Sequence, residues 1–379
     1  MAAETFVLLK NEGNLLPLKK QGKIALIGPL ADTRDNIAGT WSVAQAPEKY
    51  TTIKEAMEKA LKGKATLLYA QGSNIWRNRE LQENGEQGKP IAWGDEVKMK
   101  NEALQIAKEA DVIICAMGET ADMSGECASR TNLEMPDVQH ELLAELAKMG
   151  KPVVLLNFAG RPTVLSWENE HIPAIMNVWF GGSEVGDALC DVIFGDKVPS
   201  GKLTTSMPKT TGQEPLYYNH QNTGRPVPDD NQKFAKFASN CLDVSNGPLY
   251  PFGYGLSYTT FEYGDLKLSS HEVNRDDWKI TATINVKNTG SRDADEIVQL
   301  YIRDMVASIS RPVKELKGFQ RIHLAAGESR EISFDITPEM LKFYNAELKH
   351  VIEPGDFQIM VGGNSKEVKT QNLTVKKHP

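Results

Sequence analysis

The sequence has few cysteines, and their arrangement excludes one common class of site. Its four cysteines among 379 residues form no CxxC pair and show no zinc-ligand spacing, which excludes the usual cysteine zinc sites. Cys115 and Cys190 lie within apolar runs, so we expect both to be small core residues. Cys127 lies in a polar stretch without a histidine-rich partner segment, which disfavours it as a nucleophile.

Long apolar runs, a basic excess and phosphate-binding loops are also missing. No apolar stretch approaches the roughly 20 residues that span a bilayer. The net charge of −7 excludes a nucleic-acid binder, because no basic stripe can neutralise phosphates. A nucleotide-dependent α/β enzyme is disfavoured because no GxxxxGK[ST] occurs and no GxGxxG follows the first predicted strand. The opening, MAAETFVLLKNEG, has no signal-peptide pattern and is typical of the middle of a helix.

The first two-thirds of the chain alternates apolar runs with amphipathic helical patterns. Strands are predicted at residues 23–30, 65–70, 111–117, 152–158 and 172–180. Helices are predicted at residues 52–62, 95–110, 136–149 and 183–194. This alternation predicts βαβ units and hence a mostly parallel sheet covered by helices. Nearly every strand ends in glycine, which lets the chain turn sharply there. We therefore expect the connecting loops to lie together at one edge of the sheet.

The rest of the chain changes its pattern twice. Residues 213–262 are rich in Gly, Pro, Asn and Tyr and lack a helical period, which predicts an irregular linker. After Phe261, apolar and polar residues alternate over several short runs separated by turn signals, which predicts an antiparallel β-sandwich of the fibronectin type III kind. The predicted fold class is therefore multidomain, an α/β sandwich followed by an all-β domain. The predicted segments are 1–22 (linker or helix), 23–212 (α/β), 213–262 (linker) and 263–379 (β-sandwich).

The stretch Met117–Pro136 concentrates chemically active side chains. It follows an apolar run and contains one arginine, Arg130, and four carboxylates: Glu119, Asp122, Glu126 and Glu134. A buried strand that feeds a long polar loop is how α/β domains place chemistry at the carboxyl edge of a sheet. The residues alone leave open a solvated surface loop in which Glu126 pairs with Arg130.

Seven ordered motifs give the chain a resemblance to a known family. They are ETFVLLKNEGNLLPLKK, IALIGPLAD, ASRTNLEMPDVQ, NFAGRPTVL, WFGGSEVGDALCDVIFGDKVPSGKL, LYPFGYGLSYTTF and ELKGFQRIHLAAGE. In this order they resemble glycoside hydrolase family 3, of the periplasmic bacterial β-glucosidase type. The resemblance covers essentially the entire chain. In that family a barrel domain precedes an α/β sandwich and a fibronectin-like domain, so the resemblance implies the last two domains, with residues 1–22 leading from a barrel that is absent here.

The resemblance also implies a mechanism and a set of site residues. Retaining β-glycosidases use two carboxyl groups about 5–5.5 Å apart, a nucleophile and an acid/base. In the family the nucleophile is an aspartate on the barrel, and the acid/base is a glutamate on a loop of the α/β domain. Glu126 of SGECASR falls at the acid/base position. Because this loop varies in length within the family, Glu119 and Asp122 are the fallback candidates. Arg130, His220 and Arg225 are the expected substrate-binding residues, and no metal or organic cofactor is implied.

The missing nucleophile limits what this chain can do alone. No segment resembles the family's nucleophile region, so we expect an inactive C-terminal portion of a β-glucosidase, either a truncation or half of a split enzyme. The expected partners are a β-glucoside or oligosaccharide and a barrel domain of the same or a separate chain, with no nucleic acid and no membrane. Homo-oligomerisation stays open. Exported relatives imply a periplasmic or extracellular location. The alternative is a non-catalytic carbohydrate-binding or scaffolding protein.

Overall fold

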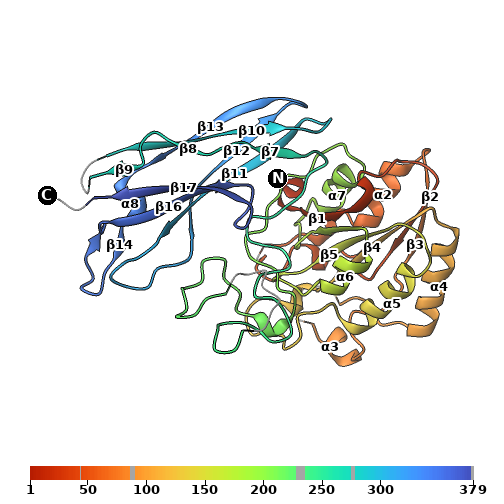
Figure 1. Ribbon diagram of the computed structural model, residues 1–379. Helices are drawn as coiled ribbons and strands as arrows, with labels where there is room; N and C mark the ends of the chain where they lie inside the picture. The colour runs from red at the N-terminus through yellow and green to blue at the C-terminus, as the bar shows by residue number, and fades with distance from the viewer. Residues whose placement is uncertain (43, 86–89, 228–234, 275–277, 377–379) are drawn as a thin grey trace. The chain divides into compact units, whose positions relative to one another are not determined.

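The chain forms two compact units. The computed structural model describes residues 1–379 except 43, 86–89, 228–234, 275–277 and 377–379 (Figure 1). The first unit comprises residues 1–201, 208–212 and 255–258, and the second comprises residues 202–207, 213–254 and 259–379. The four segment boundaries predicted from the sequence stay predictions, and each unit is described by itself.

A six-stranded sheet forms the centre of the first unit (Figure 1). Its strand order is β1-β6-β5-β4-β2-β3, in which β1 is antiparallel to β6 and the other neighbours are parallel. The strands are β1 (Val7–Asn11), β2 (Lys23–Ile27), β3 (Thr66–Ala70), β4 (Val112–Gly118), β5 (Val153–Phe158) and β6 (Ala174–Asn177). This confirms the predicted mostly parallel sheet.

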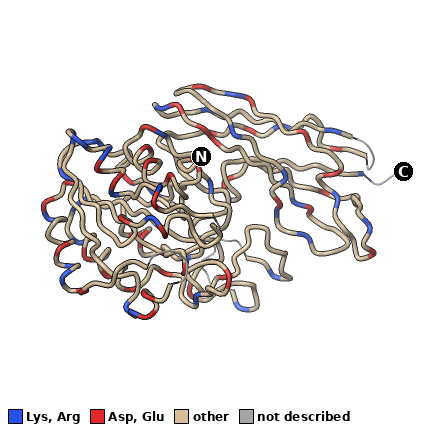
Figure 2. The backbone as a smooth tube through the Cα atoms, turned by 180° about the vertical axis from the view of Figure 1, so that it is seen from behind, with Lys and Arg blue, Asp and Glu red and all other residues tan. Residues whose placement is uncertain are grey.

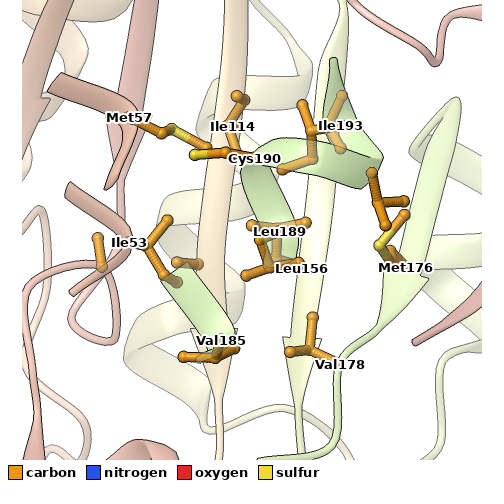
Figure 3. Close-up of a cluster of buried hydrophobic side chains, with 14 of the residues drawn as sticks. Ile53, Met57, Ile114, Leu156, Met176, Val178, Val185, Leu189, Cys190 and Ile193 are labelled. Atoms are coloured by element: carbon orange, nitrogen blue, oxygen red, sulfur yellow. The ribbon is translucent and has the colours of Figure 1, made fainter. Parts of the chain in front are cut away.

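Helices cover both faces of this sheet (Figure 1). On one face, α2 (Ile53–Leu61) and α7 (Val185–Ile193) pack together. Figure 3 shows side chains of both helices beside Ile114, Leu156 and Met176 of the central strands. Full burial of a side chain such as Leu189 stabilises the fold by about 1.5–3 kcal/mol. The other face carries α4 (Glu96–Glu109) and α5 (Asp137–Ala147), while α3 (Arg79–Glu83) and α6 (Ser166–His171) are short.

The N-terminal segment differs from the helix predicted there. Only α1 (Ala2–Thr5) is helical, and Val7–Asn11 forms the edge strand β1 with its first three residues fully buried. Periodicity does not distinguish a buried strand from a buried helix in an apolar run this short. Pairing with β6 therefore decides the outcome, because it satisfies the backbone groups of this run inside the core.

The cysteines expected in the core are buried. Cys115 lies on β4 and Cys190 on α7, and both have free thiols. Burial raises the pKa of the Cys115 thiol far above its ordinary value, and burial, with a smaller contribution from Asp187, raises the pKa of Cys190 to about 12. Both thiols therefore stay protonated and behave as packing residues.

The second unit is a β-sandwich. One sheet has the order β13-β10-β7 with β8 paired to β10, and the other has the order β12-β11-β16-β17-β9. Apolar residues of β10 (Ile280–Asn288), β11 (Ala294–Asp304) and β16 (Gly355–Gly362) alternate into one core, as predicted. The remaining elements are β7 (Phe261–Tyr263), β8 (Lys267–Leu268), β9 (Glu272–Val273), β12 (Glu315–Leu324), β13 (Ser329–Ile336), α8 (Pro338–Leu341), β14 (Phe343–Tyr344), β15 (His350–Val351) and β17 (Val368–Val375).

Charge is spread over both units. Figure 2 shows acidic and basic residues interspersed along the tube. Among the described residues, every helix is too short or too polar to cross a bilayer. The described part of residues 214–260 contains isolated β-bridges instead of helices or longer strands, in agreement with the irregular segment that the composition predicts.

Candidate active site

The polar loop predicted to carry chemistry lies where the strand order of the first sheet changes direction. From β2 the chain moves to β3 on one side, whereas β4, β5 and β6 follow on the other side. The loops that leave β2 and β4 meet at the carboxyl ends of these strands, where the backbone N–H of Ala121 donates to Asn36 Oδ1 at 3.2 Å and both loops contribute to the wall of a cavity. Both strands end at a glycine, Gly28 and Gly118, with φ of 134° and 129°. A Cβ at Gly118 would lie 2.0 Å from the carbonyl oxygen of Phe158, so only glycine fits there.

Glu126 lies at an exposed turn of the loop after β4. A short 3-10 helix, η4 (Ala121–Met123), begins the loop, and Glu126 follows between Gly125 and Cys127, which have φ of 98° and 60°. The two positive-φ positions that flank Glu126 turn the backbone sharply there. The carboxylate is therefore presented at the surface of the unit. The alternative pairing of Glu126 with Arg130 is not formed, because Arg130 binds Glu119 instead.

Glu119 is the centre of a buried ion-pair network. It follows β4 directly and is 1% exposed. Its carboxylate lies 2.8 Å from Arg130 Nη1 and 3.1 Å from Arg161 Nε, and it accepts a hydrogen bond from the backbone N–H of Gly160 at 3.2 Å. Both carboxylate oxygens are thus occupied by charged or backbone donors. This arrangement is typical of a structural anchor, because burying a carboxylate is costly unless charged and hydrogen-bonding partners surround it.

Arg130 and Asp122 line a cavity beside this network. Arg130 donates from Nη2 to the carbonyl oxygen of Glu134 at 2.8 Å, and its guanidinium lies over the ring of Trp76, 5.4 Å from the centroid. The cavity has a volume of about 710 Å³, and Asp122, Trp76 and Asn132 contribute to its wall. An aromatic ring with a few polar groups at a concave surface suits a polar organic ligand.

His220 and Arg225 lie in the second unit, in the irregular segment. The ring Nδ1 of His220 is 3.1 Å from the carbonyl oxygen of Gln221, and His220 borders a cavity of about 420 Å³. Arg225 is exposed and donates from Nη1 to the carbonyl oxygen of Phe237 at 3.3 Å. Their role in binding substrate stays a prediction.

Two residues that the sequence analysis did not single out support the loop of Glu126. Arg161 follows β5 and donates from Nη2 to the carbonyl oxygens of Met123 and, at 2.7 Å, Ala128. Thr40 follows β2, and its hydroxyl lies within hydrogen-bonding distance of the carbonyl oxygens of Ala121 and Ser124. The sequence carries only a general signal for these residues, since an irregular loop needs outside donors for its carbonyls, and it does not show which strand end supplies them.

Within the described residues, we find no group of three or more His, Cys, Asp or Glu side chains placed to hold a metal ion.

Comparison with known proteins identifies relatives along the whole chain. A family model described as the glycosyl hydrolase family 3 C-terminal domain matches residues 6–258, and one described as a fibronectin type III-like domain matches residues 296–365. A periplasmic beta-glucosidase of Salmonella typhimurium is 45% identical over 372 residues, which cover 97% of this chain and 48% of the relative. A beta-xylosidase of Formosa agariphila is 37% identical over 385 residues, which cover 99% of this chain and 49% of the relative.

Solved structures of beta-glucosidases also match this chain along its whole length. A beta-glucosidase from Listeria innocua, crystallised with isofagomine, matches with a TM-score of 0.88 at 34% sequence identity, covering 100% of this chain and 49% of that chain. The chain thus spans about half the length of the curated relatives that it matches.

Proposed function

Because this chain belongs to glycoside hydrolase family 3, we propose that it is the C-terminal portion of a retaining β-glucosidase that removes terminal β-D-glucosyl residues. In this proposal Glu126 is the general acid/base, and the nucleophile is an aspartate on a barrel domain of the same or a separate chain. This chain alone does not turn over, because the two-step displacement needs both carboxyl groups.

The position of Glu126 carries the proposal. It is exposed at a sharp turn beyond the carboxyl end of β4, where a second domain can bring a substrate against it. The fallback candidate Glu119 is less suited to proton transfer, because Arg130, Arg161 and a backbone N–H already occupy its oxygens. Asp122 remains the alternative, since it lines the cavity beside Arg130.

Each step of the reaction uses Glu126 in a definite protonation state. In the first step the barrel aspartate attacks the anomeric carbon, while protonated Glu126 gives its proton to the glycosidic oxygen and the aglycone leaves as an alcohol. In the second step the Glu126 carboxylate takes a proton from water, and the resulting hydroxide equivalent displaces the aspartate from the sugar. The sugar leaves with its original anomeric configuration, and Glu126 is protonated again.

Arg130 in the first unit is proposed to bind the substrate, and His220 and Arg225 in the second unit are each proposed as substrate-binding residues of that unit. Arg130 borders the cavity near the loop of Glu126, and its guanidinium offers donors to sugar hydroxyls. The similar proteins include both a beta-glucosidase and a beta-xylosidase. A panel of aryl β-glycosides that differ only at the C5 substituent therefore decides the sugar. A periplasmic location is proposed from the Salmonella relative.

The acid/base assignment is tested with leaving groups of different acidity. This chain is joined to, or mixed with, the barrel domain of a family 3 β-glucosidase, and kcat/KM, which reports the step in which the leaving group departs, is compared for Glu126→Gln and Asp122→Asn. Loss of the acid should lower kcat/KM for an alkyl glucoside by about 10²–10⁴-fold, and much less for a dinitrophenyl glucoside, whose leaving group needs no proton. We expect this pattern only for Glu126→Gln. The same pattern in Asp122→Asn instead would contradict the assignment.

A further inference from the structure

Arg161 holds the loop of Glu126 at two points on either side of the glutamate. One nitrogen, Nη2, donates its two protons to the carbonyl oxygens of Met123 and Ala128, three residues before and two residues after Glu126. The guanidinium therefore closes the turn that carries the glutamate, and it does so with protons fixed in one plane.

The guanidinium is itself held in place by the sheet. Its Nε lies 3.1 Å from the Glu119 carboxylate, which is 1% exposed and follows β4 directly. Arg161 follows β5, and β4 and β5 are hydrogen-bonded neighbours up to the pair Gly118 and Phe158. The side chain is only 19% exposed. Two rigid strand ends thus fix Arg161, and Arg161 in turn fixes the loop.

The two hydrogen bonds from Arg161 to the carbonyl oxygens of Met123 and Ala128 are called the clamp below. Close packing beside the clamp also restricts the loop. A Cβ at Gly160 would lie 2.1 Å from the hydroxyl of Ser124, so the chain next to Arg161 touches the loop directly. The Thr40 hydroxyl donates its single proton to one of the two nearby loop carbonyls, Ala121 or Ser124. The loop has little regular structure of its own, so these outside donors determine its conformation.

We propose that Arg161 is a positioning residue for general acid/base catalysis: it sets the position of Glu126 by binding the backbone on both sides of it. This inference rests on the proposed function of Glu126. Arg161 does not touch the substrate in this proposal. Arg161 keeps the turn ordered before the substrate binds, so no further conformational entropy is lost when Glu126 approaches the glycosidic oxygen.

The structural part is tested on this chain as it is, with a glutamate-specific endoproteinase under native conditions. The rate of cleavage after Glu126 is measured by mass spectrometry for the wild type, Arg161→Met and Arg161→Lys. The lysine keeps the charge opposite Glu119 but lacks the planar fork, so it separates loss of the clamp from loss of folding. Both variants should raise this rate by about tenfold or more, because local opening becomes easier. Arg34→Met is the matched control, since Arg34 binds Glu55 and the carbonyl of Tyr50 instead.

Two results would overturn the clamp. One is an unchanged cleavage rate after Glu126 in folded Arg161→Lys; the other is an equal rise at all sites, which reports general destabilisation.

The catalytic part uses the same chain combined with a barrel domain. Arg161→Lys should lower kcat/KM for an alkyl glucoside more than for a dinitrophenyl glucoside, as Glu126→Gln does. Equal losses for both substrates would overturn the positioning role. If the wild-type combination shows no hydrolysis, the proposed function fails and the catalytic role of Arg161 fails with it, whereas the proteolysis result still decides the clamp.

Discussion

At the scale of single residues, two carboxylates seven positions apart occupy opposite environments. Glu119 is buried between two arginines, whereas Glu126 is exposed at a turn. A buried ion pair costs desolvation energy that only good partners offset, so Glu119 stabilises the loop only while both arginines are present. Glu119, although it is a buried carboxylate between two arginines, is therefore a structural residue.

Replacing Glu119 with Gln should destabilise the first unit strongly. The amide leaves two largely buried guanidinium groups, those of Arg130 and Arg161, without a counter-charge. We expect a loss of about 3–5 kcal/mol in the free energy of unfolding, measured by urea denaturation. Glu145→Gln is the control, because its exposed pair with Lys148 should leave stability nearly unchanged. A loss no larger than in this control would contradict the role of Glu119.

His140 makes the stability of the first unit depend on pH. A hydrogen bond to the buried Glu168, 3.3 Å from His140 Nδ1, raises the pKa of His140 above its ordinary value, partial burial lowers it to a smaller extent, and Glu134 and Glu141 add to the rise. A raised pKa stabilises the folded state fully below the unfolded pKa, about 6.5. This stability is lost as the pH rises through the folded pKa.

We therefore expect the stability difference between the wild type and His140→Gln to shrink as the pH is raised from 6 towards 9. Urea unfolding of both proteins across that range measures the difference. Because the histidine is partly exposed, solvent screening keeps the effect small. A difference that grows with pH would contradict the sign of the shift.

The sequence could predict some of these residues and not others. The polar loop and its candidate Glu126 follow from the strand that feeds the loop and from the family motif. The alternative that the residues alone left open, a pairing of Glu126 with Arg130, is wrong, because a spacing of four residues brings side chains together on a helix and this loop is not helical there. In this non-helical loop Arg130 instead reaches Glu119, eleven residues earlier. Arg161 was missed because its contacts depend on the lateral pairing of β4 with β5, which sequence spacing does not reveal.

At the scale of elements, the strands and helices of the α/β unit were largely predictable, because their apolar residues recur with a clear period. The edge strand β1 was not, since its short apolar run fits a helix equally well and only pairing with β6 decides. In the sandwich, β12 and β17 expose much of their surface, so their alternation is weaker than that of β10.

Gly118 is the last residue of β4, and the loop that carries Glu126 begins directly after it. With φ of 129° and a Cβ position 2.0 Å from the Phe158 carbonyl oxygen, Gly118→Ala should cost more than about 3 kcal/mol. Gly150→Ala is the matched control, because Gly150 also has a positive φ, 68°, but open space around its Cβ position, so its cost should be about 1 kcal/mol. Thermal and urea unfolding compare the two. Equal costs would contradict the close approach of β4 and β5.

At the scale of the whole molecule, the first family model matches residues 6–258, which include nearly all of the first unit and also residues 202–207 and 213–254 of the second. The fibronectin type III-like model matches residues 296–365, which lie in the second unit. The resemblance predicted this α/β and β-sandwich organisation correctly. It could not supply the position of the proposed barrel relative to Glu126, because the described residues show no contact with such a domain. The proposed activity is therefore a property of an assembly to which this chain contributes one carboxyl group.

The most direct test of this account is hydrolysis of an aryl β-glucoside by the chain alone and after addition of a family 3 barrel domain. We expect no turnover by the chain alone, turnover on addition of the barrel, and loss of that turnover with Glu126→Gln for a substrate with a poor leaving group. Enzyme-like turnover by the chain alone that Glu126→Gln abolishes would contradict it, because a nucleophile would then lie within these 379 residues.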